Sequence, residues 1–285
     1  MKKSFKIGLL VCGLLALCWG IWAGYRYCHP AHRLTILHVN DTHSYLEPVR
    51  SGELAGQGGV IERAAFVDSV RVADGRDNVL VLHAGDFSQG TSYFTEFGAP
   101  LMVQMINAIG YDAVTLGNHE FDNGIEALGE ALSGCEVPVV VCNYDFSPFE
   151  MGKYIKPYVI VEKAGMRIGI VGVLCSLASM VSAEISNRLI ELDMVSSLQA
   201  CVDAIRPECD LVIALTHIGY EEHGPGDITD PLLCAATRGI DLFVGGHSHT
   251  FMEEPAWAPN LDGKRIPIVQ AGWTGAVMGE MHWVQ

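Results

Sequence analysis

The sequence predicts an α/β domain with helices covering the outer faces of its sheets, and three observations support this. From residue 34 onward, short apolar runs rich in β-branched residues alternate with segments of helix-compatible apolar spacing. Several of the short runs have no polar side, as expected of strands that are buried on both faces. Hydrophobic residues make up 49% of the 285 residues and charged residues only 18%, so the chain can build a packed core.

The predicted elements follow in chain order. The strands are expected at Leu34–Val39, Val79–Leu82, Ala113–Leu116, Val137–Val141, Tyr158–Val161, Arg167–Val173, Leu211–Leu215, Leu242–Val244 and Ile266–Val269. The helices are expected between them, at Gly59–Val72, Pro100–Ile109, Gly124–Leu132, Ser196–Ile205 and Pro231–Thr237. No repeat, low-complexity stretch or Pro/Ser-rich linker interrupts residues 31–285, which are therefore predicted to form a single domain.

Residues 1–30 have the pattern of an export signal or of an anchor in a membrane. Lys2, Lys3 and Lys6 precede an uncharged apolar run over residues 7–25. This run is long enough to cross a bilayer, and Leu-Ala-Leu-Cys at residues 15–18 resembles a bacterial lipoprotein signal. A cleaved signal peptide and a retained helical or lipid anchor both stay open. Either way, we expect an exported protein of the periplasm or cell envelope.

The formal net charge of −15 argues against a protein that binds nucleic acid polymers. Such proteins neutralise phosphates with clustered lysine and arginine, which this sequence lacks. A small anionic substrate would therefore need cations, and bound metal is the obvious source. The nine cysteines contain no C-x-x-C pair and lie mostly among apolar residues, so a zinc site made of thiolates is not expected.

Polar residues with ligand and acid–base chemistry stand directly after five of the predicted strands. They are Asp41 and His43 after Leu34–Val39, Asp86 after Val79–Leu82, Asn118, His119 and Asp122 after Ala113–Leu116, His217 after Leu211–Leu215, and His247 and His249 after Leu242–Val244. Strand ends form the usual active-site edge of an α/β fold. Each residue alone could cap a helix or hold a turn. A structural explanation of all of them needs a separate coincidence at every strand end.

Carboxylate, imidazole and amide groups together form a mixed oxygen and nitrogen ligand set. Such a set suits Zn, Mn, Co, Fe or Mg as divalent ions. The ligands outnumber the needs of one ion, and Asp86 has two oxygens that could bridge a pair of ions roughly 3.5–4 Å apart. The sequence therefore predicts a site for two divalent metal ions.

These strings resemble the ordered motifs of the calcineurin-like metallophosphoesterases. The resemblance rests on Asp41-x-His43, Gly85-Asp86, Gly117-Asn118-His119-Glu120, His217 and Gly246-His247-x-His249. The fuller strings at residues 37–43, 117–122 and 269–272 are similar to the branch of 5′-nucleotidases and UDP-sugar hydrolases. The resemblance covers nearly everything after residue 33. It implies a four-layer α-β-β-α sandwich, in which two mixed sheets are flanked by helices.

The resemblance also implies a role for each motif residue. One ion would be bound by Asp41, His43, Asp86 and His249, and the other by Asp86, Asn118, His217 and His247, with Asp86 shared. His119 would face the substrate phosphate, backed by Asp122, with Asn118 also contacting the substrate. A carboxylate partner orients an imidazole and favours its protonated form, which can protonate a leaving alkoxide.

The implied reaction is hydrolysis of a nucleotide or related phosphate ester by a metal-activated water, without a covalent intermediate. Pyrophosphatase or UDP-sugar hydrolase activity and cyclic-nucleotide diesterase activity stay open, because one dinuclear centre can serve mono- and diesters. A non-enzymatic binding module is the least supported alternative, since no predicted ligand is missing.

Substrate specificity is the least determined feature. Relatives usually continue into a second domain that binds the substrate, whereas this sequence ends at Gln285. Either the domain acts alone on accessible esters, or a separate substrate-binding chain completes the site. Tyr93 and Phe94, expected in a loop after Asp86, are candidates for lining a substrate pocket, although a packing role explains them equally well.

Overall fold

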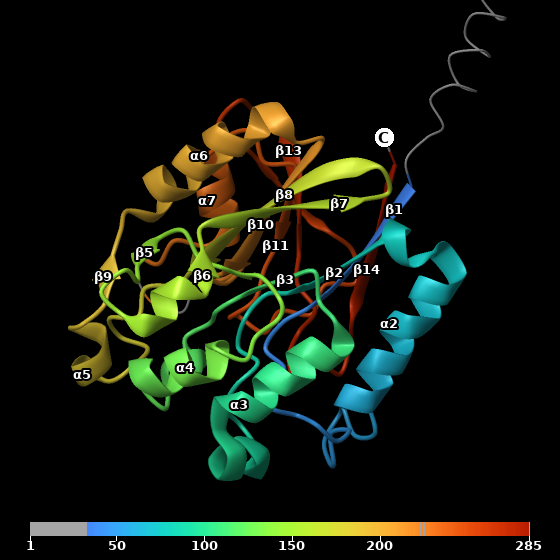
Figure 1. Ribbon diagram of the computed structural model, residues 1–285. Helices are drawn as coiled ribbons and strands as arrows, with labels where there is room; N and C mark the ends of the chain where they lie inside the picture. Colours follow the sequence, from blue (N-terminus) through green and yellow to red (C-terminus); the bar gives the residue numbers. More distant parts are fainter. Residues whose placement is uncertain (1–32, 223, 225, 285) are drawn as a thin grey trace, which may run out of the picture.

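The computed structural model describes residues 33–222, 224 and 226–284, which form two stacked sheets between two layers of helices (Figure 1). The predicted signal or anchor at residues 1–30 lies outside the described residues. Within the described ranges, no helix is both long and apolar enough to cross a membrane. The two stacked sheets and the helix layers on their outer faces confirm the predicted four-layer α-β-β-α sandwich.

Each of the two large sheets has a parallel centre and at least one antiparallel edge. The first has the order β14-β1-β2-β3-β4-β6, made of Gly279–Val284, Arg33–Val39, Val79–His83, Ala113–Thr115, Val139–Val140 and Ile155–Lys156. The second has the order β12-β13-β11-β10-β8-β7, made of Ala256–Pro259, Arg265–Val269, Leu242–Val244, Leu211–His217, Met166–Leu174 and Tyr158–Lys163. A small ribbon pairs β5 (Tyr144–Asp145) with β9 (Ile190–Glu191). Both large sheets are thus mixed, as predicted.

The helices lie on the two outer faces. The α-helices are α2 (Val60–Asp74), α3 (Ser92–Ile109), α4 (Ile125–Leu132), α5 (Ala183–Ser186), α6 (Met194–Ile205) and α7 (Asp230–Ala236). Short 3-10 turns occur at η1 (Arg76–Asn78), η2 (His119–Phe121), η3 (Glu150–Lys153) and η4 (Arg206–Glu208). Figure 1 shows α2, α3 and α4 beside the first sheet and α6 and α7 beside the second. The predicted helices are all present, and their ends are shifted by at most two residues except at the start of α3.

Alternation along the central strands builds the two kinds of core. In β1, Leu34 and Ile36 belong to a cluster between the sheets, together with β10 residues such as Ile213. Leu37 and Val39 of β1 pack instead in the cluster that includes the helices. Because successive side chains point to opposite faces, a strand between these two layers must be apolar throughout. This explains the runs without a polar side.

Helix α3 begins eight residues earlier than the predicted start at Pro100. Its first segment starts at Ser92, where the hydroxyl of Thr91 accepts a hydrogen bond from the backbone N–H of Tyr93 at 3.2 Å. The helix breaks at Gly98, whose φ of 64° is not helical, and resumes around Pro100. Proline is tolerated in the first turn of a helix, so the prediction identified only the second segment. Tyr93 and Phe94 therefore lie on a helix and not in a loop.

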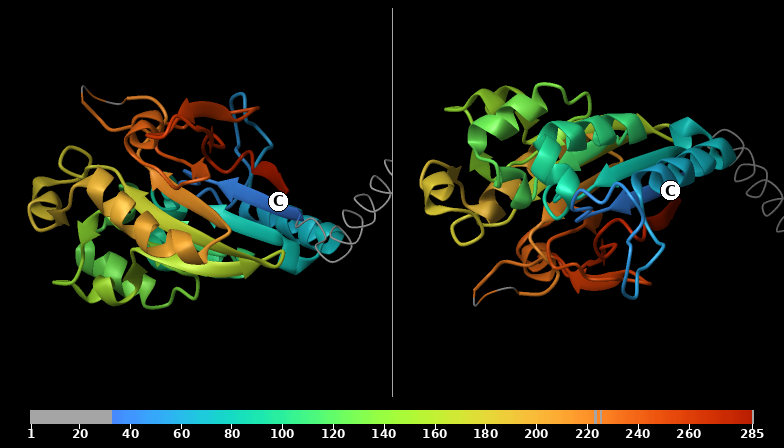
Figure 2. Two further views of the ribbon diagram at one scale, coloured as in Figure 1. Left: turned by 90° about the horizontal axis from the view of Figure 1, so that it is seen from above. Right: turned by 90° about the horizontal axis from the view of Figure 1, so that it is seen from below.

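The strand β14 was not predicted, although its apolar residues are visible in the sequence. It pairs antiparallel with β1, joining Arg33 to Val284 and Leu37 to Glu280. Figure 2 shows β14 beside β1 from both directions. Only one face of this edge strand is covered, which gives a weak alternation that is hard to recognise without its partner.

Candidate active site

The predicted site residues come from strand ends of both sheets. Asp41 and His43 follow β1, Asp86 follows β2, and Asn118 follows β3, all in the first sheet. His217 is the last residue of β10, and His247 and His249 follow β11, both in the second sheet. Because the sheets are stacked with these strand ends on the same side, side chains more than 170 residues apart in the sequence come into contact.

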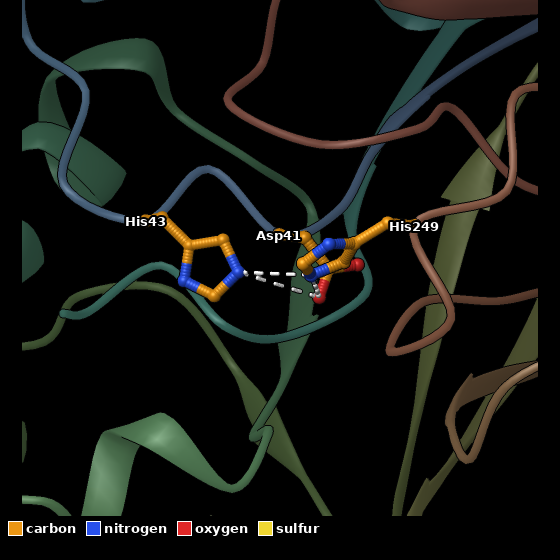
Figure 3. Close-up of side chains that lie close together, drawn as sticks. All are labelled: Asp41, His43 and His249. Atoms are coloured by element: carbon orange, nitrogen blue, oxygen red, sulfur yellow. Dashed lines mark hydrogen bonds and ion pairs between the residues drawn. The ribbon is translucent and has the colours of Figure 1, made fainter. Parts of the chain in front are cut away.

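One group, which we call the outer cluster, consists of Asp41, His43 and His249. The Nε2 atoms of the two histidines lie 3.1 Å apart, and Asp41 Oδ1 lies 3.3 Å from His249 Nε2 and 3.9 Å from His43 Nε2. Figure 3 shows the three side chains converging on one point. Asp41 and His43 are buried, whereas 40% of the His249 side chain is exposed, so the cluster opens to solvent on one side.

The second group, which we call the inner cluster, consists of Asp86, His217 and His247. Asp86 Oδ2 lies 3.1 Å from His217 Nε2, and the rings of His217 and His247 are 5.1 Å apart. Asp41 Oδ1 lies 3.8 Å from the same His217 nitrogen, which places the two clusters side by side. The structure thus brings six of the seven predicted ligands into two adjacent groups.

The seventh predicted ligand, Asn118, is buried beside them but is not joined to either cluster by these distances. Its amide oxygen lies 3.8 Å from the Cys175 thiol, and the backbone N–H of the next residue, His119, donates to Asp86 Oδ1 at 2.9 Å. Its φ of −71° excludes the left-handed turn that would explain an asparagine after a glycine. Its role as a ligand stays a prediction.

Backbone strain is concentrated in the two clusters. Asp41, His43, Asp86, His247 and His249 all have positive φ, between 45° and 83°. Aspartate and histidine tolerate this region better than most residues, but it still costs roughly 1–2 kcal/mol for each L-residue. A glycine would adopt the conformation without strain. The strain therefore persists at positions where the side chain matters more than the backbone preference.

The donor atoms in the clusters fit bound cations. Asp41 Oδ1 is buried and makes no hydrogen bond within the described part of the chain, although His249 Nε2 lies 3.3 Å away. A buried polar atom without a partner is costly unless an ion or a water satisfies it. Carboxylate oxygens and imidazole nitrogens without thiolates form the ligand set of a catalytic metal site and not of a structural zinc site.

The electrostatics of His217 and Asp86 reflect the same need for positive charge. Burial disfavours the charged form of His217, but the Asp86 and Asp41 carboxylates outweigh it and raise its pKa to about 10. Burial likewise opposes ionisation of Asp86, yet His217 holds the pKa of that carboxyl well below its usual range. His217 Nδ1 donates to the carbonyl of Ala84 at 2.7 Å, which turns Nε2 toward the carboxylates. A bound cation would offset the same negative charges.

His119 and Asp122 form a pair next to the outer cluster. His119 Nδ1 lies 2.9 Å from Asp122 Oδ2, and its ring centre lies 5.3 Å from that of His43. The hydrogen bond to Asp122 outweighs partial burial and raises the pKa of His119. Asp122 does not cap α4, whose N-cap is Gly124, so the explanation of Asp122 as a helix cap does not hold. His119 stands beside the clusters and outside both.

Glu120 is a site residue that sequence reasoning missed. Its buried carboxylate accepts hydrogen bonds from the backbone N–H groups of Asp86 and Ser88, both at 2.9 Å, and of Gly117 at 2.6 Å. Burial and the Asp86 charge raise its pKa to about 7. The carboxylate ties the loop after β2 to the loop after β3. A side chain at Gly117 would meet Asp86 Oδ1 at 2.1 Å, which explains that glycine.

Asn40 positions Asp41 from the other side. Its amide donates to Asp41 Oδ2 and to the carbonyl of Gly272, both at 2.6 Å, and its oxygen accepts from the backbone N–H of Ala271 at 2.8 Å. The string at residues 269–272 therefore serves as a support for the outer cluster.

Gln270 supports the loop that carries His247 and His249. Its side-chain oxygen accepts from the backbone N–H of Thr250 at 2.6 Å, and its nitrogen donates to the carbonyl of Gly246 at 3.0 Å. Both supports were present in the motif strings, but no pattern in the sequence assigned them a role.

A pocket of about 560 Å³ lies against the outer cluster. Its lining includes Tyr45, Tyr93, Phe251 and Trp273. The Trp273 ring stacks on His249 with centroids 5.4 Å apart and an interplanar angle of 3°. Of the two predicted pocket aromatics, Tyr93 lines this space, whereas Phe94 is buried in the hydrophobic core and does not.

The fold and the site together define a class of protein. Two stacked mixed sheets with paired carboxylate–imidazole clusters at their strand ends are typical of metal-dependent phosphoesterases. The profile of the calcineurin-like phosphoesterases matches residues 34–251, and the chain belongs to this family.

Similar proteins include several 5′-nucleotidases. The chain is 34% identical over 271 residues to the 5′-nucleotidase of Rattus norvegicus, covering 86% of this chain and 45% of that protein. Among solved structures, the 5′-nucleotidase precursor of Thermus thermophilus aligns with a TM-score of 0.78 at 33% identity, over 88% of this chain and 51% of the other. The NAD nucleotidase of Haemophilus influenzae aligns with a TM-score of 0.75 at 30% identity, over 89% of this chain and 47% of the other. The chain thus spans about half the length of these relatives.

Proposed function

We propose that this domain is a 5′-nucleotidase-like phosphohydrolase that hydrolyses nucleotides or related phosphate esters with two divalent ions bound. The observation that carries the proposal is the adjacency of the inner and outer clusters, with the His119–Asp122 pair at their edge. Relatives named 5′-nucleotidase and NAD nucleotidase support nucleotide-type substrates. Because those proteins are about twice as long, the proposal concerns the chemistry of this domain.

The proposed ligand sets follow the two clusters. Asp41, His43 and His249 would hold one ion and His217 and His247 the other, with Asp86 between them and Asn118 completing the second set. Two divalent ions, when bound, would polarise the phosphoryl oxygens and lower the pKa of a bound water to about 7. The distance of 3.8 Å from Asp41 Oδ1 to His217 Nε2 supports a pair of neighbouring ions.

The proposed role of His119 is that of the general acid. Its hydrogen bond to Asp122 fixes the ring and favours the protonated imidazole, leaving Nε2 to donate toward the substrate. His119 Nε2 then holds a proton for the leaving alkoxide oxygen, and the amide of the neighbouring Asn118 would contact the phosphoryl group. No side-chain nucleophile is needed, because water attacks phosphorus in line.

We also propose that the chain acts outside the cytoplasm, attached through residues 1–30. The support is the lysine-flanked apolar pattern of that segment. Membrane fractionation with N-terminal sequencing of the mature chain tests it, and an intact chain in the cytoplasm would contradict it.

A requirement for a separate substrate-binding chain is tested by measuring turnover of the purified chain alone.

The central test compares two substitutions, one in the clusters and one beside them. Asp86→Asn should remove bound metal and activity together, because both proposed sites use this carboxylate. His119→Asn should reduce kcat by roughly 10²–10⁴-fold with little change in metal content. Metal analysis and a hydrolysis screen over nucleotides, sugar nucleotides, cyclic nucleotides and simple phosphate esters, before and after chelation, provide the readout. Equal metal loss in both variants would contradict the assigned roles.

A further inference from the structure

The pocket beside the outer cluster is built from the same segments as the cluster itself. Tyr45 stands two residues after His43, and Phe251 stands two residues after His249. Gly90 packs against His43, where an added Cβ would lie 2.9 Å from the His43 carbonyl oxygen. With Trp273 stacked on His249, the pocket begins where the proposed metal site ends. A molecule whose phosphoryl group lies at the clusters would therefore extend into it.

Aromatic rings line the pocket and remain partly exposed. Phe251 is 46% exposed and Trp273 is 37% exposed, whereas aromatic residues of this size are usually largely buried. Tyr45 meets Trp273 edge to face at 6.3 Å. The Phe251 ring lies over Gly272, where a Cβ would meet it at 2.2 Å, so one side of the ring is supported by backbone. Such rings are platforms for stacking another flat ring.

The polar groups of the lining suit the neutral end of a substrate better than its phosphate. The charged lining residues are Glu47, Arg50 and Glu53, which leaves a net negative charge. Glu47 accepts a hydrogen bond from the Tyr93 hydroxyl at 3.0 Å and pairs with Arg50. These groups can hydrogen-bond to ring nitrogens, amino groups or sugar hydroxyls. The volume of about 560 Å³ lies within the usual range for small-molecule sites, about 300–1,000 Å³.

We propose that this pocket binds the base of a nucleoside phosphate and that Phe251 is a specificity-determining residue. This inference rests on the proposed function, because it places the phosphoryl group at the two clusters. The base stacks against the exposed aromatic rings, with Glu47 and Arg50 at its edge. The domain then selects nucleotides over aliphatic phosphate esters with its own residues.

The kinetic test uses the metal-loaded full chain with two substrates, adenosine monophosphate and glycerol phosphate. Phe251→Ala should lower kcat/KM for the nucleotide by about 5- to 150-fold, through KM, and leave glycerol phosphate unchanged. Phe251→Tyr keeps a ring and should restore the nucleotide value. Trp257→Ala removes an aromatic residue of similar exposure, 51%, which lies outside the pocket lining, and should change neither substrate.

A binding test separates failure of the pocket from failure of the proposed function. Adenosine, which has no phosphate to hydrolyse, should quench part of the chain's tryptophan fluorescence on binding, through contact with Trp273, and Phe251→Ala should raise its Kd by about 5-fold or more. Quenching without any hydrolysis would support the pocket and count against the phosphohydrolase. Hydrolysis of glycerol phosphate without adenosine binding would overturn the pocket alone. An equal loss for both substrates in Phe251→Ala would assign the ring a structural role and also overturn it.

Discussion

Two fully buried histidines at the ends of parallel strands behave in opposite ways. His83 ends β2 and His217 ends β10, and neither side chain reaches solvent. Burial, reinforced by the Arg63 charge, lowers the pKa of His83 to about 3, whereas neighbouring carboxylates raise that of His217 to about 10 despite burial. His83 faces the helix layer and meets the rings of Phe87 and Tyr111. His217 faces Asp86.

The side of the sheet on which each histidine lies decides its protonation chemistry. On the helix side, the His83 imidazole packs against aromatic rings, and its polar contact is the Thr42 hydroxyl at 3.1 Å. Because burial disfavours its charged form, this imidazole stays neutral. Between the sheets, in the absence of metal, the protonated imidazole of His217 neutralises carboxylates that would otherwise be buried without a positive charge.

The largest effect is expected for His217→Leu in the metal-free protein. The substitution leaves the buried Asp86 and Asp41 carboxylates without a cation, which should lower the free energy of unfolding by about 3–5 kcal/mol. Urea denaturation of the chelator-treated chain at pH 7 measures it. His83→Gln is the matched control and should cost far less, because His83 is neutral at that pH. Equal losses would show that the two histidines do not differ in charge.

The next effect is a pH dependence. His83 has its ordinary pKa of 6.5 when unfolded and about 3 when folded, so below pH 6.5 the unfolded chain binds the additional proton. Folding stability should therefore fall with decreasing pH by about 1.4 kcal/mol per unit from this residue, or about 3 kcal/mol between pH 6 and 4. In His83→Gln, this contribution disappears and the stability curve is flatter by that amount. If the curves of stability against pH are parallel for the wild type and His83→Gln, the His83 imidazole is not held neutral in the folded protein.

A smaller loss of stability is expected for substitution of Glu120, whose carboxylate joins the loops after β2 and β3. Glu120→Gln places an amide N–H₂ against backbone N–H groups that need an acceptor, which should cost about 1–3 kcal/mol. Because those groups orient Asp86, metal affinity should fall by roughly 10–100-fold. Calorimetric titration with Mn²⁺ checks this. Unchanged affinity would limit Glu120 to a role in stability.

The smallest loss of stability is expected for substitution of Asp193, which lies in the helix layer away from both histidines. Asp193 caps α6 by accepting from the backbone N–H of Ser196 at 2.8 Å. Asp193→Ala should lower stability only slightly, through loss of this helix cap, and leave metal content and turnover unchanged. Thermal denaturation and metal analysis provide the check. A change in metal binding would mean that the helix layer, and not only the strand ends, controls the site.

Local patterns in the sequence were sufficient for the central strands, the helix layers and the residues of the two clusters, but not for edge strands such as β14. Apolar runs such as Leu34–Val39 report burial on both faces, and the polar residues after them follow from the chemistry of strand ends. Asp41 and His249 were both visible, yet nothing local places them 3.3 Å apart. That contact depends on the stacking of two sheets.

Short segments of the chain were enough to identify the side chains that could form a site, because ligand chemistry and strand periodicity are local properties. Tertiary structure decided the rest: that Tyr93 lines the pocket while Phe94 joins the core, that Glu120 accepts hydrogen bonds from two loops, and that neighbouring groups raise the pKa of His217 and lower that of His83. The physical reason is that the pKa and exposure of a group depend on neighbours that are distant in the chain and are set only when the layers pack.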